Sequence, residues 1–280
     1  MSGSELRAFL RSCVPAGARD VARRVLGRSH PFGLAEADLQ RLQGLPRYRA
    51  VEIEFFGRPL CICDAASFLS AWREIFAGQI YRFRATRQQP VIIDAGANIG
   101  LATIYLRRQY PESRIVALES DPQIFEILRS NLAAQNLGAV EILNRAVWDA
   151  DEPLRFSQDH ADAGRVGAGG EIHVQGMRFR SLLEQQDCVD FLKLDIEGAE
   201  ARVLLDCESV LHRVQQIFVE YHSLTGQPQR LSELLGVLQR SGFRCYIERV
   251  GVRSGCPLVH IEVESGFDLQ LNIFGIRCGI

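Results

Sequence analysis

The sequence predicts an α/β fold in which a mostly parallel sheet carries helices on both faces. Short apolar runs such as VIIDA (91–95) and RIVALE (114–119) alternate with segments of helical periodicity. Such runs are typical of strands buried on both faces, and their spacing indicates strand–helix–strand units. The turn AGANIG (95–100) follows the first run, at the place where open α/β sheets bind their ligands.

Residues 1–88 are predicted to form a helical and β-hairpin extension before a domain at 89–280. We expect helices within residues 1–50, a hairpin in which VEIEFF (51–56) and PLCICD (59–64) flank Gly57-Arg58, and a helix over 66–83. The arginine-rich segment 18–28 could form a helix, and docking on the body is favoured over contact with a membrane surface. We expect the extension to shape a ligand pocket or a homodimer contact.

The remaining elements follow at regular intervals after Val91. Ser120 or Asp121 followed by Pro122 is a strong helix start. The glycine-rich stretch 157–171 is expected to be a loop. About seven strands are expected in all, at 91–95, 114–119, 140–148, 191–196, 216–222, 243–250 and 269–277, with helices after the first, near 121–136, from Gly198 and near 229–241.

Composition narrows the classes of function. The 280 residues are 47% hydrophobic and 24% charged, with a net charge of −2, so nothing global attracts nucleic acid and we expect no such partner. The eight cysteines form no CxxC pair, which favours free thiols over zinc or disulfides. With no transmembrane run and no signal-peptide pattern, we expect a cytoplasmic protein.

A nucleoside site is predicted where the first two strands end. Asp94, Gly96, Asn98 and Gly100 carry the chain tightly over the sheet edge, and glycine lets a ligand approach the backbone closely. Glu119 ends the second strand, where a carboxylate can accept both hydroxyls of a ribose. The turn reads G-A-N-I-G rather than GxGxxG, and it lacks the glycine that lets a dinucleotide pyrophosphate settle on the helix N-terminus. The pattern therefore favours S-adenosylmethionine over a nicotinamide dinucleotide.

The blocks DAGANIG, ALESDP, NRAVWD and LKLDIEGAE (192–200) resemble the FkbM family of S-adenosylmethionine-dependent methyltransferases, from about Tyr81 to about Ile247. The resemblance implies a seven-stranded Rossmann-like class I methyltransferase sheet with an antiparallel final strand. It also implies O-methyl transfer to a hydroxyl of a sugar, glycolipid or polyketide-type metabolite, an acceptor that is a small molecule or linked to a glycan.

By the same resemblance, donor-site roles fall on specific positions. Glu119 would hold the ribose with Ser120 and Asp121 beside it, and Asp195 would meet the donor or the acceptor hydroxyl. The other positions implied are Asp94, Gly96 and Asn98 beside the methionine part, with Gly100 in the same turn, and Asn144, Ala146 and Val147 beside the adenine.

Catalytic candidates end two neighbouring strands. Asp195 with Glu197, and Glu220 with His222, are each two residues apart, and His222 or Asp195 could accept the proton of an acceptor hydroxyl. Structural interpretations stay open: Glu197 and Glu200 could favour a helix start, and His222 could cap a strand. Lys193, the only lysine of the chain, could cover the sheet end.

Three further possibilities carry less weight. Asp195, Glu220 and His222 could bind a divalent metal, although we expect a metal-free site. His160 with Asp159 and Asp162 lies in the glycine-rich loop, and Tyr81 and Phe83 could line a pocket or pack in the core. Two other classes of function remain as alternatives, a nicotinamide-dependent oxidoreductase and a non-catalytic nucleoside-binding module.

Overall fold

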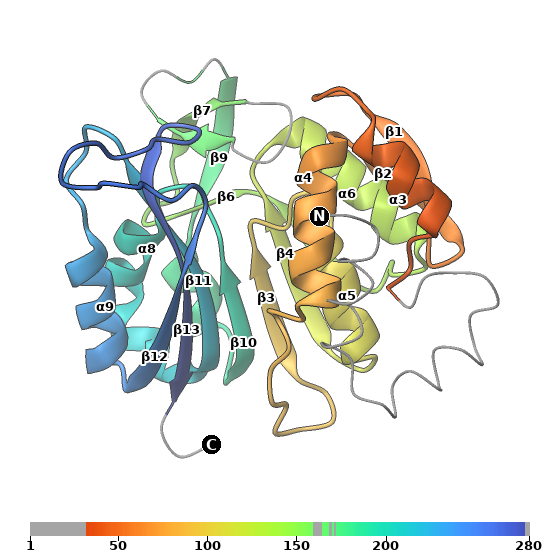
Figure 1. The fold of residues 1–280 in the computed structure, drawn as a ribbon. Coiled ribbons are helices and arrows are strands. Elements are labelled where there is room, and N and C mark those ends of the chain that lie inside the picture. The colour runs from red at the N-terminus through yellow and green to blue at the C-terminus, as the bar shows by residue number, and fades with distance from the viewer. Residues whose placement is uncertain (1–31, 159–163, 168–169, 171, 278–280) are drawn as a thin grey trace.

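The computed structural model describes residues 32–158, 164–167, 170 and 172–277, and a seven-stranded sheet forms its centre (Figure 1). The strand order is β12-β13-β11-β10-β3-β4-β5. The strands are β3 (Val91–Ala95), β4 (Arg114–Glu119), β5 (Glu141–Asn144), β10 (Val189–Leu194), β11 (Val214–Leu224), β12 (Phe243–Val250) and β13 (Phe267–Arg277).

The direction of the strands confirms the predicted class of sheet. The pairs β4/β5, β3/β4, β10/β3 and β10/β11 are parallel, whereas β13 is antiparallel to both of its neighbours, β11 and β12. Because parallel strands end at the same edge, the residues that follow β3, β4, β10 and β11 meet there. This edge holds the site described below.

Helices cover both faces of the sheet, as predicted (Figure 1). One face packs against α5 (Leu101–Gln109) and α6 (Pro122–Ala134), and the other against α7 (Phe179–Glu184), α8 (Glu200–Cys207) and α9 (Leu231–Arg240). A 3₁₀ helix, η2 (Glu208–Arg213), follows α8. None of the helices in the described ranges is long and apolar enough to cross a membrane.

The part of the extension that the structure describes packs on the α5/α6 face. It contains α3 (Glu36–Gln43), the predicted hairpin β1 (Val51–Phe55) and β2 (Arg58–Ile62), α4 (Ala65–Trp72) and a π-helix, η1 (Arg73–Ala77). Its apolar side chains join those of α5 and α6 in one core. The Asn131 side chain accepts a bond from Cys61 N and donates to Cys61 O and Ile99 O, at 2.8–2.9 Å, which ties the hairpin to the glycine turn.

Two element predictions need correction. The predicted third strand, 140–148, breaks at Arg145, because β5 pairs with β4 whereas β6 (Ala146–Trp148) leaves the sheet to pair with β9 (Ile172–Arg178). β6 and β9 form a second sheet with β7 (Pro153–Ser157) and β8 (Arg165–Val166), which the sequence analysis did not foresee. The helix predicted over 66–83 ends at Ala77. The segment 18–28 lies outside the described residues.

Candidate active site

A cavity of about 530 Å³ opens at the edge where β3, β4, β10 and β11 end. Most of the residues predicted for the donor and for catalysis line it. These are Gly96, Asn98, Glu119, Ser120, Asp121, Ala146, Val147, Asp195, Glu197, Glu220 and His222. Asp94, Gly100 and Asn144 are not among the lining residues.

The glycine turn is held close to the end of β10. Gly96 has a φ of +87°, and a Cβ built on it would lie 1.8 Å from the carbonyl oxygen of Asp195. Only glycine fits there without moving backbone. Gly100, at φ +98°, is the N-cap of α5, and a Cβ built on it would lie 2.9 Å from Leu128, so both its left-handed backbone and the packing of α6 favour glycine there.

Glu119 is a buried carboxylate at the wall of the cavity. One oxygen, Oε2, accepts a bond from Asn98 N at 2.9 Å, and Oε1 accepts one from Asp121 N at 2.8 Å. Burial raises the pKa of this carboxyl to about 7, against the effect of those two backbone donors. Oε1 also accepts a long bond from the Ser120 hydroxyl at 3.5 Å, whereas Oε2 keeps a further lone pair for another donor.

Lys193 and Asp94 form the floor under the glycine turn. Lys193 Nζ donates to Gly96 O at 2.6 Å and lies 3.1 Å from Asp195 Oδ2 and 3.5 Å from Asp94 Oδ1. Asp94 also accepts a bond from Thr103 Oγ1 at 2.6 Å and is fully buried. Burial by itself lowers the pKa of Lys193, but the carboxylates of Asp195 and Asp94 more than offset it and keep the ammonium charged. The ion pair between Lys193 and Asp94 joins the ends of β10 and β3.

Asn144 and Asp121 both make local structural contacts. Asn144 Nδ2 donates to the backbone oxygens of Glu119 and Ser120, at 2.9 and 3.2 Å, which turns its side chain away from the cavity. Asp121 is the N-cap of α6 and accepts bonds from Gln123 N at 2.7 Å and from the Gln158 side chain. Ala146 and Val147 instead present small apolar surfaces to the cavity.

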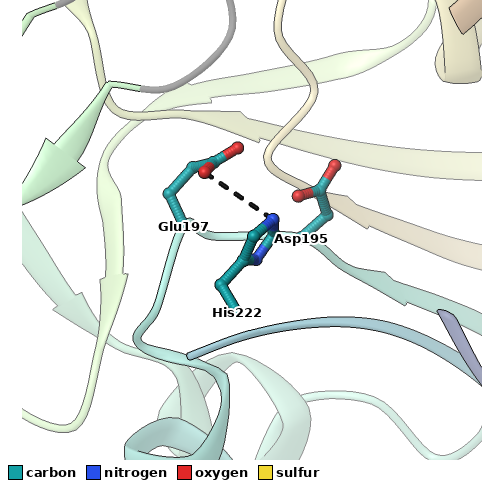
Figure 2. A group of neighbouring side chains, drawn as sticks. All are labelled: Asp195, Glu197 and His222. Carbon is teal, nitrogen blue, oxygen red and sulfur yellow. Dashed lines mark ion pairs between the residues drawn. The ribbon is translucent and has the colours of Figure 1, made fainter. Parts of the chain in front are cut away.

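A histidine surrounded by carboxylates lies on the β10–β11 side of the cavity. His222 Nδ1 lies 3.0 Å from Oε1 of the fully buried Glu200, and Nε2 lies 3.7 Å from Glu197 Oε2 and 3.6 Å from Glu220 Oε1. Figure 2 shows Glu197 and Asp195 on either side of the ring. Because Glu200 also accepts bonds from Ile196 N and Gly198 N, it holds the turn after β10 and the imidazole in one arrangement.

The charges of this cluster are strongly coupled. Burial opposes the charged imidazolium, but Glu200, then Glu197 and Glu220, raise the pKa of His222 well above its usual value. Burial raises the pKa of Glu197 well above its ordinary range, and burial with the Asp195 charge raises the pKa of Glu220 to about 8. Three carboxyl groups, those of Glu197, Glu200 and Glu220, therefore share one imidazole in a poorly solvated place.

Glu200 is the site residue that the sequence analysis did not single out. Its position near the start of α8 suggested only a helix-end effect, whereas its side chain binds a histidine 22 residues along the chain. Glu200 is the last residue of the LKLDIEGAE block, and its place in that block was the sequence feature that could have identified it.

The extension completes the cavity wall. Polar side chains on and beside α4 and η1, including those of Ser67, Ser70 and Glu74, line it. Tyr81 lines it too and packs edge-on against Phe218, whereas Phe83 stacks on Phe191 in the core. Asp159, His160 and Asp162 lie outside the described residues.

One group of side chains has the spacing of a metal site. The ligand atoms of Asp195, Glu197 and His222 lie within 4.8 Å of one another. Glu197 therefore takes the place that the sequence analysis gave to Glu220.

Comparisons with known proteins show similarity to methyltransferases. The model for the Methyltransferase FkbM domain matches residues 94–245. Methyltransferase sdnD of Sordaria araneosa is 26% identical over 203 residues, covering 59% of this chain and 78% of the relative. The 31-O-demethyl-FK506 methyltransferase FkbM of Streptomyces tacrolimicus is 26% identical over 239 residues, covering 71% of this chain and 90% of the relative.

Similarity to solved structures is weaker. The YcgJ protein of Bacillus subtilis superposes with a TM-score of 0.44 at 11% identity, over 71% of this chain and 97% of the other. The family match spans more than half of the chain and includes the glycine turn, Glu119 and the acidic cluster. The chain belongs to the FkbM methyltransferase family.

Proposed function

We propose that this methyltransferase uses S-adenosylmethionine to methylate a hydroxyl group of a small or glycan-linked acceptor, of the sugar, glycolipid or polyketide type. One observation carries the proposal: a single cavity is lined both by Glu119 with the glycine turn and by Asp195, Glu220 and His222. The residues predicted for the donor and the candidate proton acceptors thus line the same cavity, which supports aligned transfer of a methyl group to a hydroxyl bound there.

The residues around Glu119 fit an adenosine. Each carboxylate oxygen has one backbone donor, and Oε1 has in addition only the long bond from Ser120 Oγ at 3.5 Å, so one ribose hydroxyl could bond Oε2 and the other could replace Ser120 at Oε1. Ala146 and Val147 offer apolar surface for a flat base. Gly96 and Asn98 would lie beside the methionine part, and Asp94 would act through Lys193, since it does not line the cavity.

When bound, S-adenosylmethionine would supply a methyl group on a positively charged sulfur that takes back the bonding electron pair. The chain has to align the acceptor oxygen and receive its proton. Glu220 suits the second task because its side chain is 24% exposed toward the cavity, whereas Asp195 is paired with Lys193 and His222 with Glu200. Glu220 thus replaces His222 and Asp195 as our first choice of base.

An oxygen acceptor is supported by two observations. The printed name of the Streptomyces relative describes methylation of an O-demethyl compound. In this chain, Ser67, Ser70 and Glu74 give the wall contributed by the extension hydroxyl and carboxylate groups that can bond a hydroxylated acceptor. The family assignment speaks against the oxidoreductase and the non-catalytic module.

The first test is calorimetric titration with S-adenosylhomocysteine and, separately, with NADH. We expect binding of the former alone, weakened at least about tenfold in Glu119→Ala by the loss of two charge-assisted hydrogen bonds. Glu126→Ala is the matched control, because Glu126 is exposed on α6, the helix that follows Glu119, and pairs with Arg129. Binding of NADH alone would overturn the donor assignment.

The second test is transfer of a labelled methyl group from S-adenosylmethionine to a panel of hydroxylated acceptors. Once an acceptor is found, Glu220→Gln should lower kcat by about 100-fold or more with little change in donor affinity. An unchanged kcat would remove Glu220 from the proton path. Label that appears only on nitrogen or carbon would overturn O-methyl transfer.

A further inference from the structure

We propose that Asp195, Glu197 and His222 form a binding site for one divalent cation of the Mn²⁺ type, placed to ligate the acceptor oxygen. The three ligand atoms lie within 4.8 Å of one another (Figure 2), and all three residues line the cavity. Two carboxylates and one imidazole are a common ligand set for divalent first-row metals.

The orientation of His222 is the independent observation. Its side chain is 1% exposed, and Nδ1 lies 3.0 Å from the Glu200 carboxylate, which accepts its N–H. Among the described residues, Nε2 has no hydrogen-bond partner within 3.5 Å; Glu197 and Glu220 lie just beyond that distance. A histidine whose second nitrogen donates to a buried carboxylate while the first faces an open position is the usual arrangement around a protein-bound metal.

The separations suit a shared ion better than direct hydrogen bonds. Ligands bound to one ion at about 2.1 Å lie about 3.0 Å apart when adjacent and about 4.2 Å apart when opposite. The 3.7 Å between His222 Nε2 and Glu197 Oε2 falls between these values. Small rotations of two side chains would bring their atoms into bonding distance of a common ion.

The balance of charge also favours a cation. Asp195, Glu197, Glu200 and Glu220 surround one imidazole, and the ammonium of Lys193 is already shared between Asp94 and Asp195. A buried carboxyl group stays ionised only beside a positive partner. A divalent ion would supply two charges at the point where the carboxylates converge.

The chemical role rests on the proposed function. An acceptor hydroxyl bound to the ion would become more acidic, because the cation stabilises the alkoxide. Its proton would pass to Glu220, the oxygen would bond to the methyl carbon, and the carbon–sulfur electron pair would stay with sulfur. Three side chains leave further coordination positions for the acceptor.

The test is titration of the chelator-treated protein with Mn²⁺, in which the paramagnetic resonance signal of free Mn²⁺ disappears on binding. We expect one strong Mn²⁺ site per chain, with affinity lowered at least about tenfold in Glu197→Gln. Glu200→Gln should lower the affinity about 10–100-fold, because Glu200 orients His222 without touching the ion. Glu233→Gln is the matched control, because the Glu233 side chain is exposed on α9 and pairs with Arg230.

Binding of S-adenosylhomocysteine by the same samples separates the two proposals and confirms folding. A variant that binds the nucleoside but has lost Mn²⁺ supports the cation site. Wild-type protein that binds the nucleoside but no Mn²⁺ overturns the cation site and leaves the methyl-transfer proposal standing. Mn²⁺ binding that is equal in wild type and Glu197→Gln also overturns it.

Discussion

Glu119 should make the protein less stable as the pH rises. Burial raises the pKa of this carboxyl from 4.5 to about 7, so the folded chain binds the proton more tightly than the unfolded chain does. The stabilisation is therefore fully present below about pH 4.5 and is lost as the pH rises through about 7. A pKa difference of this size corresponds to about 3 kcal/mol in the free energy of unfolding.

The perturbation that isolates this effect is Glu119→Gln, because an amide does not titrate. The amide has a single acceptor oxygen, so one of the backbone N–H groups of Asn98 and Asp121 loses its partner. That loss costs about 1–3 kcal/mol at every pH and shifts the whole curve by a constant. The informative quantity is the difference between variant and wild type as a function of pH.

Urea unfolding between about pH 4.5 and pH 8 measures this difference. We expect the free energy of unfolding of Glu119→Gln to gain about 3 kcal/mol relative to wild type across that range. Glu126→Gln, an exposed change on α6, should run parallel to wild type. Parallel curves for Glu119→Gln, within about 0.5 kcal/mol, would refute the assignment of a raised pKa to this carboxyl.

Three further changes test the frame of the site by urea unfolding. Gly96→Ala should lower the free energy of unfolding by at least about 2 kcal/mol, because φ is positive there and the new Cβ would lie 1.8 Å from a backbone oxygen. Gly138→Ala is the control and should change the free energy of unfolding little, because a Cβ at Gly138 would meet open space. Thr103→Val should cost about 2 kcal/mol through the lost 2.6 Å bond to Asp94. Asn131→Ala should cost about 3 kcal/mol, because it removes three bonds that hold the hairpin and the glycine turn.

Each of these has a contrary outcome. Equal stability of Gly96→Ala and Gly138→Ala would mean that the glycine turn can move away from β10. A neutral Thr103→Val would show that Lys193 alone satisfies Asp94. If Asn131→Ala unfolded in two steps rather than one, the extension would be a separate folding unit. The division of the chain at residues 88 and 89 stays a prediction until such a measurement.

Local sequence determined the elements and the positions of the residues predicted to bind the donor. Continuous apolar runs predicted the strands and a period of 3.6 residues predicted the helices, because burial on both faces of a strand or on one face of a helix imposes these patterns locally. The start of α6 at Asp121-Pro122 and the place of Glu119 at the end of β4 are set by residues close to them in the sequence. Glu119 and Gly96 therefore lie where the sequence placed them.

Tertiary structure decided the contacts that join distant segments. The bond from Glu200 to His222, the position of Lys193 between Asp94 and Asp195, and the departure of β6 from the sheet all depend on strands meeting across the fold. A side chain near a strand end can face the cavity or bond the backbone, and Asn144 does the latter. Periodicity fixes which face a residue takes, but only the packing of the whole chain fixes which partner it meets there.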